Sequence, residues 1–126
     1  MSEKRYPCPC CGHLVFESPP GSEDICLVCF WEDDLDQLRF PDLRDGANVP
    51  SLLEAQANVK RWGAIEERFA TDVRPPSADE SLDPEWRPID ASDAFESSDH
   101  GGEPPEDPTA LYYWRRSYWR SALRRN

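Results

Sequence analysis

Two stretches, Cys8-Pro9-Cys10-Cys11-Gly12 and Cys26-Leu27-Val28-Cys29, each contain two cysteines separated by two residues. A C-x-x-C loop places two thiolates on the same side of a tight turn, and a second loop supplies the other two corners of a tetrahedron. We therefore expect one zinc ion, bound by Cys8, Cys11, Cys26 and Cys29. Four thiolates leave no open position for water, so the predicted zinc is structural and not catalytic.

Other interpretations of the five cysteines remain open. A disulfide framework would leave one cysteine unpaired, and C-x-x-C pairs also serve as redox dithiols. His13 could replace one thiolate, and Cys10 is expected either to pack as a small apolar group or to lie beside the ligands as a free thiol. The chain opens without an apolar secretory segment, so we expect a reducing, cytoplasmic location, where close cysteines more often bind metal.

The first part of the chain, residues 1–72, is expected to form a small α+β domain stapled by the zinc ion. Two short β-rich runs, residues 14–16 and 25–30, flank a turn signal and predict a zinc-ribbon-like β-hairpin, or two irregular strands, that brings the cysteine pairs together. Residues 31–50 are expected to form a loop.

One or two short helices should follow this loop. Ser51 and Glu54 form a capping box, and Gly63 is a natural helix terminator. The helix between them would carry an apolar stripe at spacings of three and four residues, made of Leu52, Ala55, Val59 and Trp62. Residues 65–71 could add a second short helix, with Phe69 facing inward. Core packing is the ordinary role of such a stripe.

The charge of the chain is unevenly distributed. The net charge is −11, with 13 prolines and a mean hydropathy of −0.77. Residues 71–108 carry a net −10, and residues 109–126 carry five arginines and no acid. We expect residues 73–108 to be an acidic, proline-rich segment that is either disordered until it wraps a partner or pinned extended across the first domain by Trp86, Ile89 and Phe95.

The last residues, 109–126, are predicted to form a basic, aromatic amphipathic helix. Asp107 or Thr109 would cap this helix, and Pro108 suits a first helical position. On such a helix Trp114 lies on the apolar face, and Arg116 and Arg120 lie on the opposite side. We expect this helix to dock on the first domain or in a groove of a partner, with its arginines paired with the chain's own acids. No apolar run is long enough to span a bilayer, so no membrane span is expected.

The cysteine motif and its surroundings resemble the bacterial cysteine-rich CPCC domain family. The resemblance begins at Tyr6-Pro7-Cys8-Pro9-Cys10-Cys11-Gly12, continues through residues 25–34, and returns in residues 46–48, 51–55, 63–69 and 73–76. It covers residues 5–76. The resemblance implies a small zinc-binding domain of unassigned activity, and family members that in part occur near secreted or contact-dependent toxin systems.

The sequence favours an interaction protein over an enzyme. The chain has two histidines, and neither a nucleophile–base pair nor a phosphate-binding glycine loop is evident. We expect a bacterial immunity protein (an antitoxin) that fills the basic active-site cleft of a toxin with carboxylates, since complementary charge also speeds association. The expected partner-binding residues are Glu32, Asp33, Asp34, Asp36, Trp86, Trp114, Arg116, Trp119 and Arg120.

Three other functions remain in competition. Arginines interleaved with aromatic residues in the tail suit single-stranded nucleic acid, so the alternative is a zinc-ribbon adaptor that contacts nucleic acid through the C-terminal helix. The same helix could dock on a membrane surface, against the repulsion of the acidic body. The acidic cluster at Glu32 could bind a hard cation. The sequence does not predict an oligomeric state.

Overall fold

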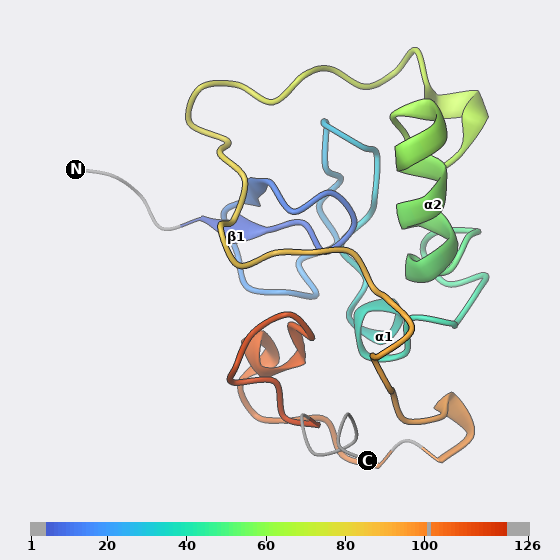
Figure 1. Ribbon diagram of the computed structural model, residues 1–126, viewed down its shortest axis with the longest axis vertical. Helices are drawn as coiled ribbons and strands as arrows, with labels where there is room; N and C mark the ends of the chain where they lie inside the picture. The colour runs from blue at the N-terminus through green and yellow to red at the C-terminus, as the bar shows by residue number, and fades with distance from the viewer. Residues whose placement is uncertain (1–4, 101, 121–126) are drawn as a thin grey trace.

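The computed structural model describes residues 5–100 and 102–120, and most of this chain is loop and turn (Figure 1). Its regular elements are β1 (Tyr6–Pro7), β2 (Leu14–Phe16), α1 (Leu35–Arg39), α2 (Leu52–Trp62) and three 3-10 turns, η1 (Glu67–Phe69), η2 (Ser98–His100) and η3 (Pro108–Leu111). The fold is thus a small domain with a two-stranded hairpin and few helices. None of its helices, within the part of the chain described, is long and apolar enough to cross a membrane.

The hairpin exists, but its strands differ from the predicted ones. Strand β2 pairs antiparallel with β1, with Tyr6 opposite Phe16 and a register irregularity beside it, and does not pair with residues 25–30. Ile25 instead forms an isolated bridge with Glu32. Each cysteine pair is therefore enclosed by its own short antiparallel contact, because closing a short loop costs less chain entropy than closing a long one.

Helix α2 follows the prediction closely. The Ser51 side chain accepts from the N–H of Glu54, the Glu54 carboxylate accepts from the N–H of Ser51, and Gly63 ends the helix in the left-handed conformation. Leu52 and Ala55 are fully buried, and Val59 packs against the core. Trp62, the fourth residue of the predicted stripe, is half-buried outside this core, with the guanidinium of Arg61 over its ring. The capping interactions at both ends are local, so the sequence alone is enough to predict them.

Two helix predictions need correction. Residues 31–50 contain a helix, α1, where a loop was expected; Asp34 caps it by accepting from the N–H groups of Asp36 and Gln37. Five residues are too few to display helical periodicity, so the capping residue was the only available signal. Conversely, residues 65–71 form only the single turn η1 and not a second helix. Phe69 is half-buried and packs on Phe30, with ring centroids 4.5 Å apart.

The described part of residues 73–108, here called the strap, is extended and lies on the first domain. In Figure 1 it runs, yellow to orange, from the end of α2 past β1 and back toward α1. Leu82 forms an isolated bridge with His13, and Trp86, Ile89 and Phe95 pack against the core. Of the two alternatives, the structure adopts the extended one.

The described part of the tail is not an amphipathic helix. Only η3 is helical, Tyr112 after it is extended, and residues 113–120 form turns; residues 121–126 of the predicted helix lie outside the described residues. The reason is burial: Leu111, Tyr112, Tyr113 and Trp114 are all buried, and four consecutive residues cannot share one face of a helix.

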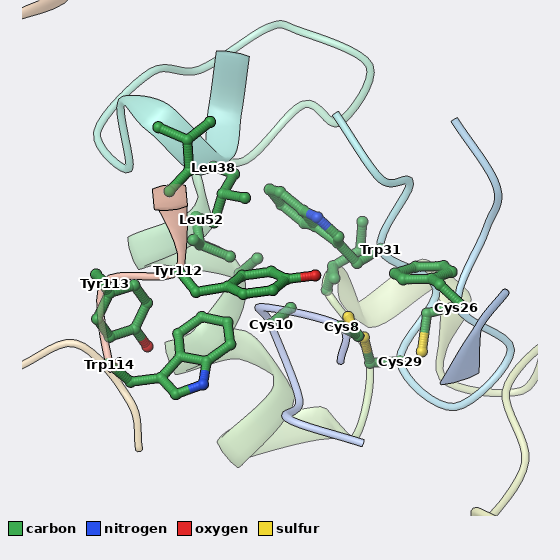
Figure 2. Close-up of a cluster of buried hydrophobic side chains, with 14 of the residues drawn as sticks. Cys8, Cys10, Cys26, Cys29, Trp31, Leu38, Leu52, Tyr112, Tyr113 and Trp114 are labelled. Atoms are coloured by element: carbon green, nitrogen blue, oxygen red, sulfur yellow. The ribbon is translucent and has the colours of Figure 1, made fainter. Parts of the chain in front are cut away.

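Side chains from the cysteine loops, both helices, the strap and the C-terminal segment pack together in one core. Figure 2 shows Tyr112, Tyr113 and Trp114 beside Leu52 of α2 and Leu38 of α1, with Trp31 and the cysteines next to them. Trp31 and Tyr113 are fully buried. The C-terminal aromatic residues therefore complete a core that the first domain does not fill alone.

Candidate metal centre

Four cysteine sulfur atoms converge at one end of this core. The Sγ atoms of Cys8, Cys11, Cys26 and Cys29 all lie within 4.8 Å of one another. Cys8 and Cys29 are 3.7 Å apart, and Cys11 and Cys26 are 3.8 Å apart, so the closest pairs join the two loops. A disulfide bond is about 2.05 Å long, so these distances exclude one, and all five cysteines are free.

The spacing of the sulfur atoms matches a tetrahedral thiolate site. With Zn–S bonds of about 2.3 Å, the edge of the tetrahedron is about 3.8 Å. The four residues predicted from the sequence are thus brought together in a geometry that fits a metal ion of this size. No other group of three or more His, Cys, Asp or Glu side chains converges in this way among residues 5–100 and 102–120.

The two cysteine loops have the same backbone geometry. In each loop the N–H of the first cysteine donates to the carbonyl five residues later, at 2.9 Å from Cys8 and 2.8 Å from Cys26. The carbonyl of that cysteine accepts, at 2.7 Å, from the N–H four residues later, which is Gly12 in one loop and Phe30 in the other. Both of these residues have positive φ, 83° and 77°. This left-handed residue turns the chain back and directs both thiols of a loop to the same side.

The thiols influence one another strongly. Burial raises the pKa of Cys8 and of Cys29, whereas hydrogen bonds donated by the thiols of Cys11, Cys29 and Cys8 lower the pKa of Cys26. Without a cation, protons must be shared in this small volume. A divalent cation replaces those protons and neutralises the thiolates, so its binding is coupled to proton release.

The neighbours of the four cysteines have separate roles. Cys10 is buried outside the cluster and burial raises its pKa, but its thiol also hydrogen-bonds with Cys29, so it lies beside the ligands as a free thiol. The Nδ1 atom of His13 bonds to the carbonyl of Glu80 at 2.8 Å, and His13 is not part of the cluster. The carbonyl of Pro9 accepts from Gln56 Nε2 and from Trp86 Nε1, which fixes the first loop to α2 and to the strap.

Gln56 is the residue that sequence reasoning missed. Its Nε2 donates to Pro9 and to the hydroxyl of Tyr113, both at 2.9 Å, and its Oε1 accepts from the N–H of Ile89 at 2.8 Å. One amide thereby joins the cysteine loop, α2, the strap and the C-terminal segment. The available signal was its position, because a polar residue four places after Leu52 falls on the buried stripe.

The four predicted acidic residues divide into two groups. Asp33 is only 2% exposed and accepts from Ser22, and Asp34 caps α1 and accepts from Ala47. Glu32, Asp36 and also Asp34, but not Asp33, line a hollow of about 610 Å³. We call it the acidic groove; five carboxylate residues line it, namely Glu23, Glu32, Asp34, Asp36 and Glu106.

The other predicted contact residues lie elsewhere. Trp86 covers Gly12, and Trp114 is 7% exposed and donates to Asp83. Arg120 stacks on Trp119, with its guanidinium 4.0 Å from the ring centroid, and donates to Glu96; Arg116 is exposed. The structure therefore does not gather the nine predicted residues on one surface.

The acids of the strap are paired with arginines of the same chain. Glu96 accepts from both Arg39 and Arg120, and Arg87 binds Asp93 through two nitrogens at 2.7 Å. The remaining pairs are Arg5–Asp79, Arg74–Glu80, Arg87–Asp90, Arg115–Asp83 and Arg115–Glu85. Much of the strap's negative charge is thus neutralised internally. Among the described residues no cation pairs with Glu23, Glu32, Asp36 or Glu106 of the acidic groove.

Comparison with known families agrees with this geometry. A family model described as "Cysteine-rich CPCC" matches residues 6–80, a range that contains all four converging cysteines and ends at Glu80 in the strap. The resemblance expected over residues 5–76 is confirmed. The search of curated proteins found no match.

Proposed function

Since this chain belongs to the cysteine-rich CPCC family, we propose that it is a non-enzymatic protein-interaction module whose fold depends on one structural zinc ion. The observation that carries the metal assignment is the 3.7–3.8 Å spacing of the sulfur atoms across the two loops. Cys8, Cys11, Cys26 and Cys29 would hold the ion, which supplies a fourfold cross-link to a domain with few regular elements. A site filled by four protein ligands has no position for a substrate.

The proposed partner is a protein with a basic surface, and the proposed role is that of a bacterial immunity protein. The support is the acidic groove, in which carboxylates without a cationic partner among the described residues surround a hollow of about 610 Å³. Carboxylates that line a concave site attract basic groups and speed association. Bound to a toxin, this surface would occupy a basic active-site cleft and exclude the substrate.

The acidic groove replaces the strap as the proposed contact surface. In one of the two alternatives for the strap its acids wrap the partner, but many of them bind the chain's own arginines. Breaking those pairs to bind a partner would cost the free energy that they contribute to the fold. Glu32 and Asp36 are available without that cost.

The nucleic-acid alternative receives no such support. Stacking on single strands requires exposed aromatic faces. Tyr112, Tyr113, Trp114 and Tyr118 are buried, and Arg115 and Arg120 are paired with acids.

The experiment has two independent parts. Metal analysis of the purified protein should give one zinc ion per chain. Binding to the product of the adjacent gene should then be measured by calorimetry at two salt concentrations, together with protection of cells that express that product. We expect Glu32→Lys with Glu106→Lys to weaken binding at least tenfold, and added salt to weaken wild-type binding.

A matched control uses two acids outside the groove. Glu67 and Asp72 are exposed and outside the groove lining, so Glu67→Lys with Asp72→Lys makes the same change in net charge without altering the acidic groove. Equal weakening by this control variant would mean that only net charge matters. Absence of both binding and protection would end the immunity proposal and leave the metal assignment intact.

A further inference from the structure

A second hollow lies between α2, the strap and the two cysteine loops. Its volume is about 560 Å³, within the range of small-molecule sites. Its apolar lining comes from three separate segments and includes Val28, Leu53, Val59, Trp86, Pro88 and Ile89. We call this hollow the apolar groove.

The walls of the apolar groove are fixed by hydrogen bonds that do not depend on a ligand. Trp86 donates from Nε1 to the carbonyl of Pro9 at 3.0 Å and lies directly against Gly12. The N–H of Ile89 bonds to Gln56 of α2 at 2.8 Å, which holds the strap beside the helix. The groove is therefore already formed without a ligand, so ordering its walls costs little of the binding free energy.

The apolar groove differs from the rest of the surface in having no carboxylate in its lining, although two of the converging cysteines, Cys11 and Cys29, are part of it. The chain has 25 acidic residues, yet none of them is among the residues that line this groove. The ionisable lining residues besides the cysteines are Lys60 and His13. Lys60 is exposed in the last turn of α2, and no carboxylate among the described residues pairs with it. The groove therefore combines apolar walls with an unpaired ammonium group.

From these features we infer that the apolar groove binds a small amphipathic anion, a molecule with an apolar body and one carboxylate or similar acidic group. The body would cover the side chains of Leu53, Trp86 and Ile89, which leave water on binding. The acidic group would lie beside Lys60. This inference is independent of the immunity role, since the apolar groove and the acidic groove share no lining residue.

The test uses 8-anilinonaphthalene-1-sulfonate, an aromatic anion that fluoresces in apolar surroundings, titrated into the full chain. We expect saturable binding of one probe per chain, displaced by octanoate at lower concentration than by 1-octanol. Lys60→Gln should weaken binding about threefold, the effect of losing one exposed charge contact. Ala57→Phe, which fills the groove from the exposed face of α2, should weaken it more than tenfold.

Arg61→Gln is the matched control, because Arg61 is the next residue of α2, is exposed and does not line the groove. It should leave the affinity unchanged. Thermal unfolding and metal content of every variant confirm that the probe reports a native site. Unchanged binding in Ala57→Phe, or no saturable binding at all, would overturn the proposal. If octanol displaced the probe as well as octanoate and Lys60→Gln had no effect, the anion proposal would be wrong and the groove would be a contact for apolar side chains of a partner protein.

Discussion

Among single residues, the cysteines separate into four that converge and one that does not. Cys8, Cys11, Cys26 and Cys29 have sulfur atoms within 4.8 Å of one another, and Cys10 is buried outside this set. The backbone explains the difference, because the left-handed residue after each C-x-x-C motif directs the first and fourth positions of the loop to one side. Cys10 lies between those positions.

Replacing a converging cysteine should unfold the protein, whereas replacing Cys10 should not remove the metal. We expect Cys26→Ser and Cys29→Ser to lose bound zinc and cooperative unfolding, since metal binding and folding are coupled. Cys10→Ser should keep one zinc ion per chain and lose at most about 2 kcal/mol, the cost of a buried hydroxyl. Metal analysis with thermal unfolding checks both. Equal metal loss in all three variants would contradict the ligand assignment.

Gly12 and Gly63 provide a matched pair for the contact between the first loop and the strap. Their φ angles are 83° and 80°, but a Cβ on Gly12 would lie 2.5–2.8 Å from the ring of Trp86, whereas a Cβ on Gly63 would meet nothing within 4 Å. Gly63→Ala should therefore cost about 1 kcal/mol, the conformational penalty alone. Gly12→Ala should cost about 3 kcal/mol, because Trp86 must also move.

Urea unfolding of both glycine variants measures this difference. Trp86 fluorescence is one of five tryptophan signals, so the free energy of unfolding is the quantity to compare. Similar losses for the two variants would mean that the strap does not press on the loop at Gly12.

At the level of the elements, ion pairs hold the strap in place, whereas capping hydrogen bonds stabilise the two helices. Arg74 donates to both carboxylate oxygens of Glu80, at 2.7 and 3.0 Å. This guanidinium lowers the pKa of Glu80 to about 2. The strap thus begins at a clamp whose strength depends on pH.

Glu80→Gln should remove a pH-dependent part of the stability. The pKa of Glu80 in the folded state is below its ordinary value of 4.5, so the stabilisation is complete above about pH 4.5 and is lost as the pH falls toward 2. Since Arg74 is partly exposed, we expect the variant to be less stable by about 2 kcal/mol at pH 7, with a smaller difference below pH 4.5. Unfolding free energies of both proteins at each pH provide the measurement.

Acid also removes metal from both proteins, so only the difference between them reports on Glu80. Asp72→Asn, at an exposed acid without a cationic partner among the described residues, is the control and should leave the pH profile unchanged. A constant difference between pH 7 and pH 3 would contradict the role of the clamp.

Across the whole molecule, the C-terminal segment is a structural part of the core. The Tyr113 hydroxyl donates to the carbonyl of Arg87 at 2.6 Å and accepts from Gln56, which ties the segment to the strap and α2. The neighbouring Tyr112 hydroxyl is buried and has no hydrogen-bond partner among the described residues. Two adjacent buried tyrosines thus differ in whether their hydroxyl is satisfied.

Removing each hydroxyl should have opposite effects. Tyr113→Phe should destabilise the protein by about 1–2 kcal/mol, because it breaks two hydrogen bonds between segments. Tyr112→Phe should be neutral or should stabilise by up to about 1 kcal/mol, because it removes an unsatisfied polar group from the core. Chemical unfolding monitored by circular dichroism distinguishes the two. Equal destabilisation of the two variants would mean that hydrogen bonding of the hydroxyl does not determine the change in stability at either site.

The sequence by itself determined the features that depend on neighbours close along the chain. The four converging cysteines follow from the spacing within each C-x-x-C loop, and α2 follows from the capping box at Ser51 and the glycine at its end. These interactions act within a few residues, so their pattern can be recognised without knowing the path of the chain. Helix α1 is the exception, because five residues hold too little periodic information.

Only the tertiary structure decided which surfaces remain for function. The apolar stripe in the tail is compatible with a helix, but the four consecutive residues from Leu111 to Trp114 are all buried in the core. A helix would place only some of these side chains on its buried face, so the segment is not helical. The sequence favours pairing of the tail arginines with the chain's own acids but does not identify the partner of any arginine: Arg39 lies 57 positions from its partner Glu96, and Arg5 lies 74 positions from Asp79. Whether residues so far apart in the sequence form an ion pair depends on the path of the folded chain. For that reason the sequence predicted the metal centre, and the fold alone revealed the acidic and apolar grooves.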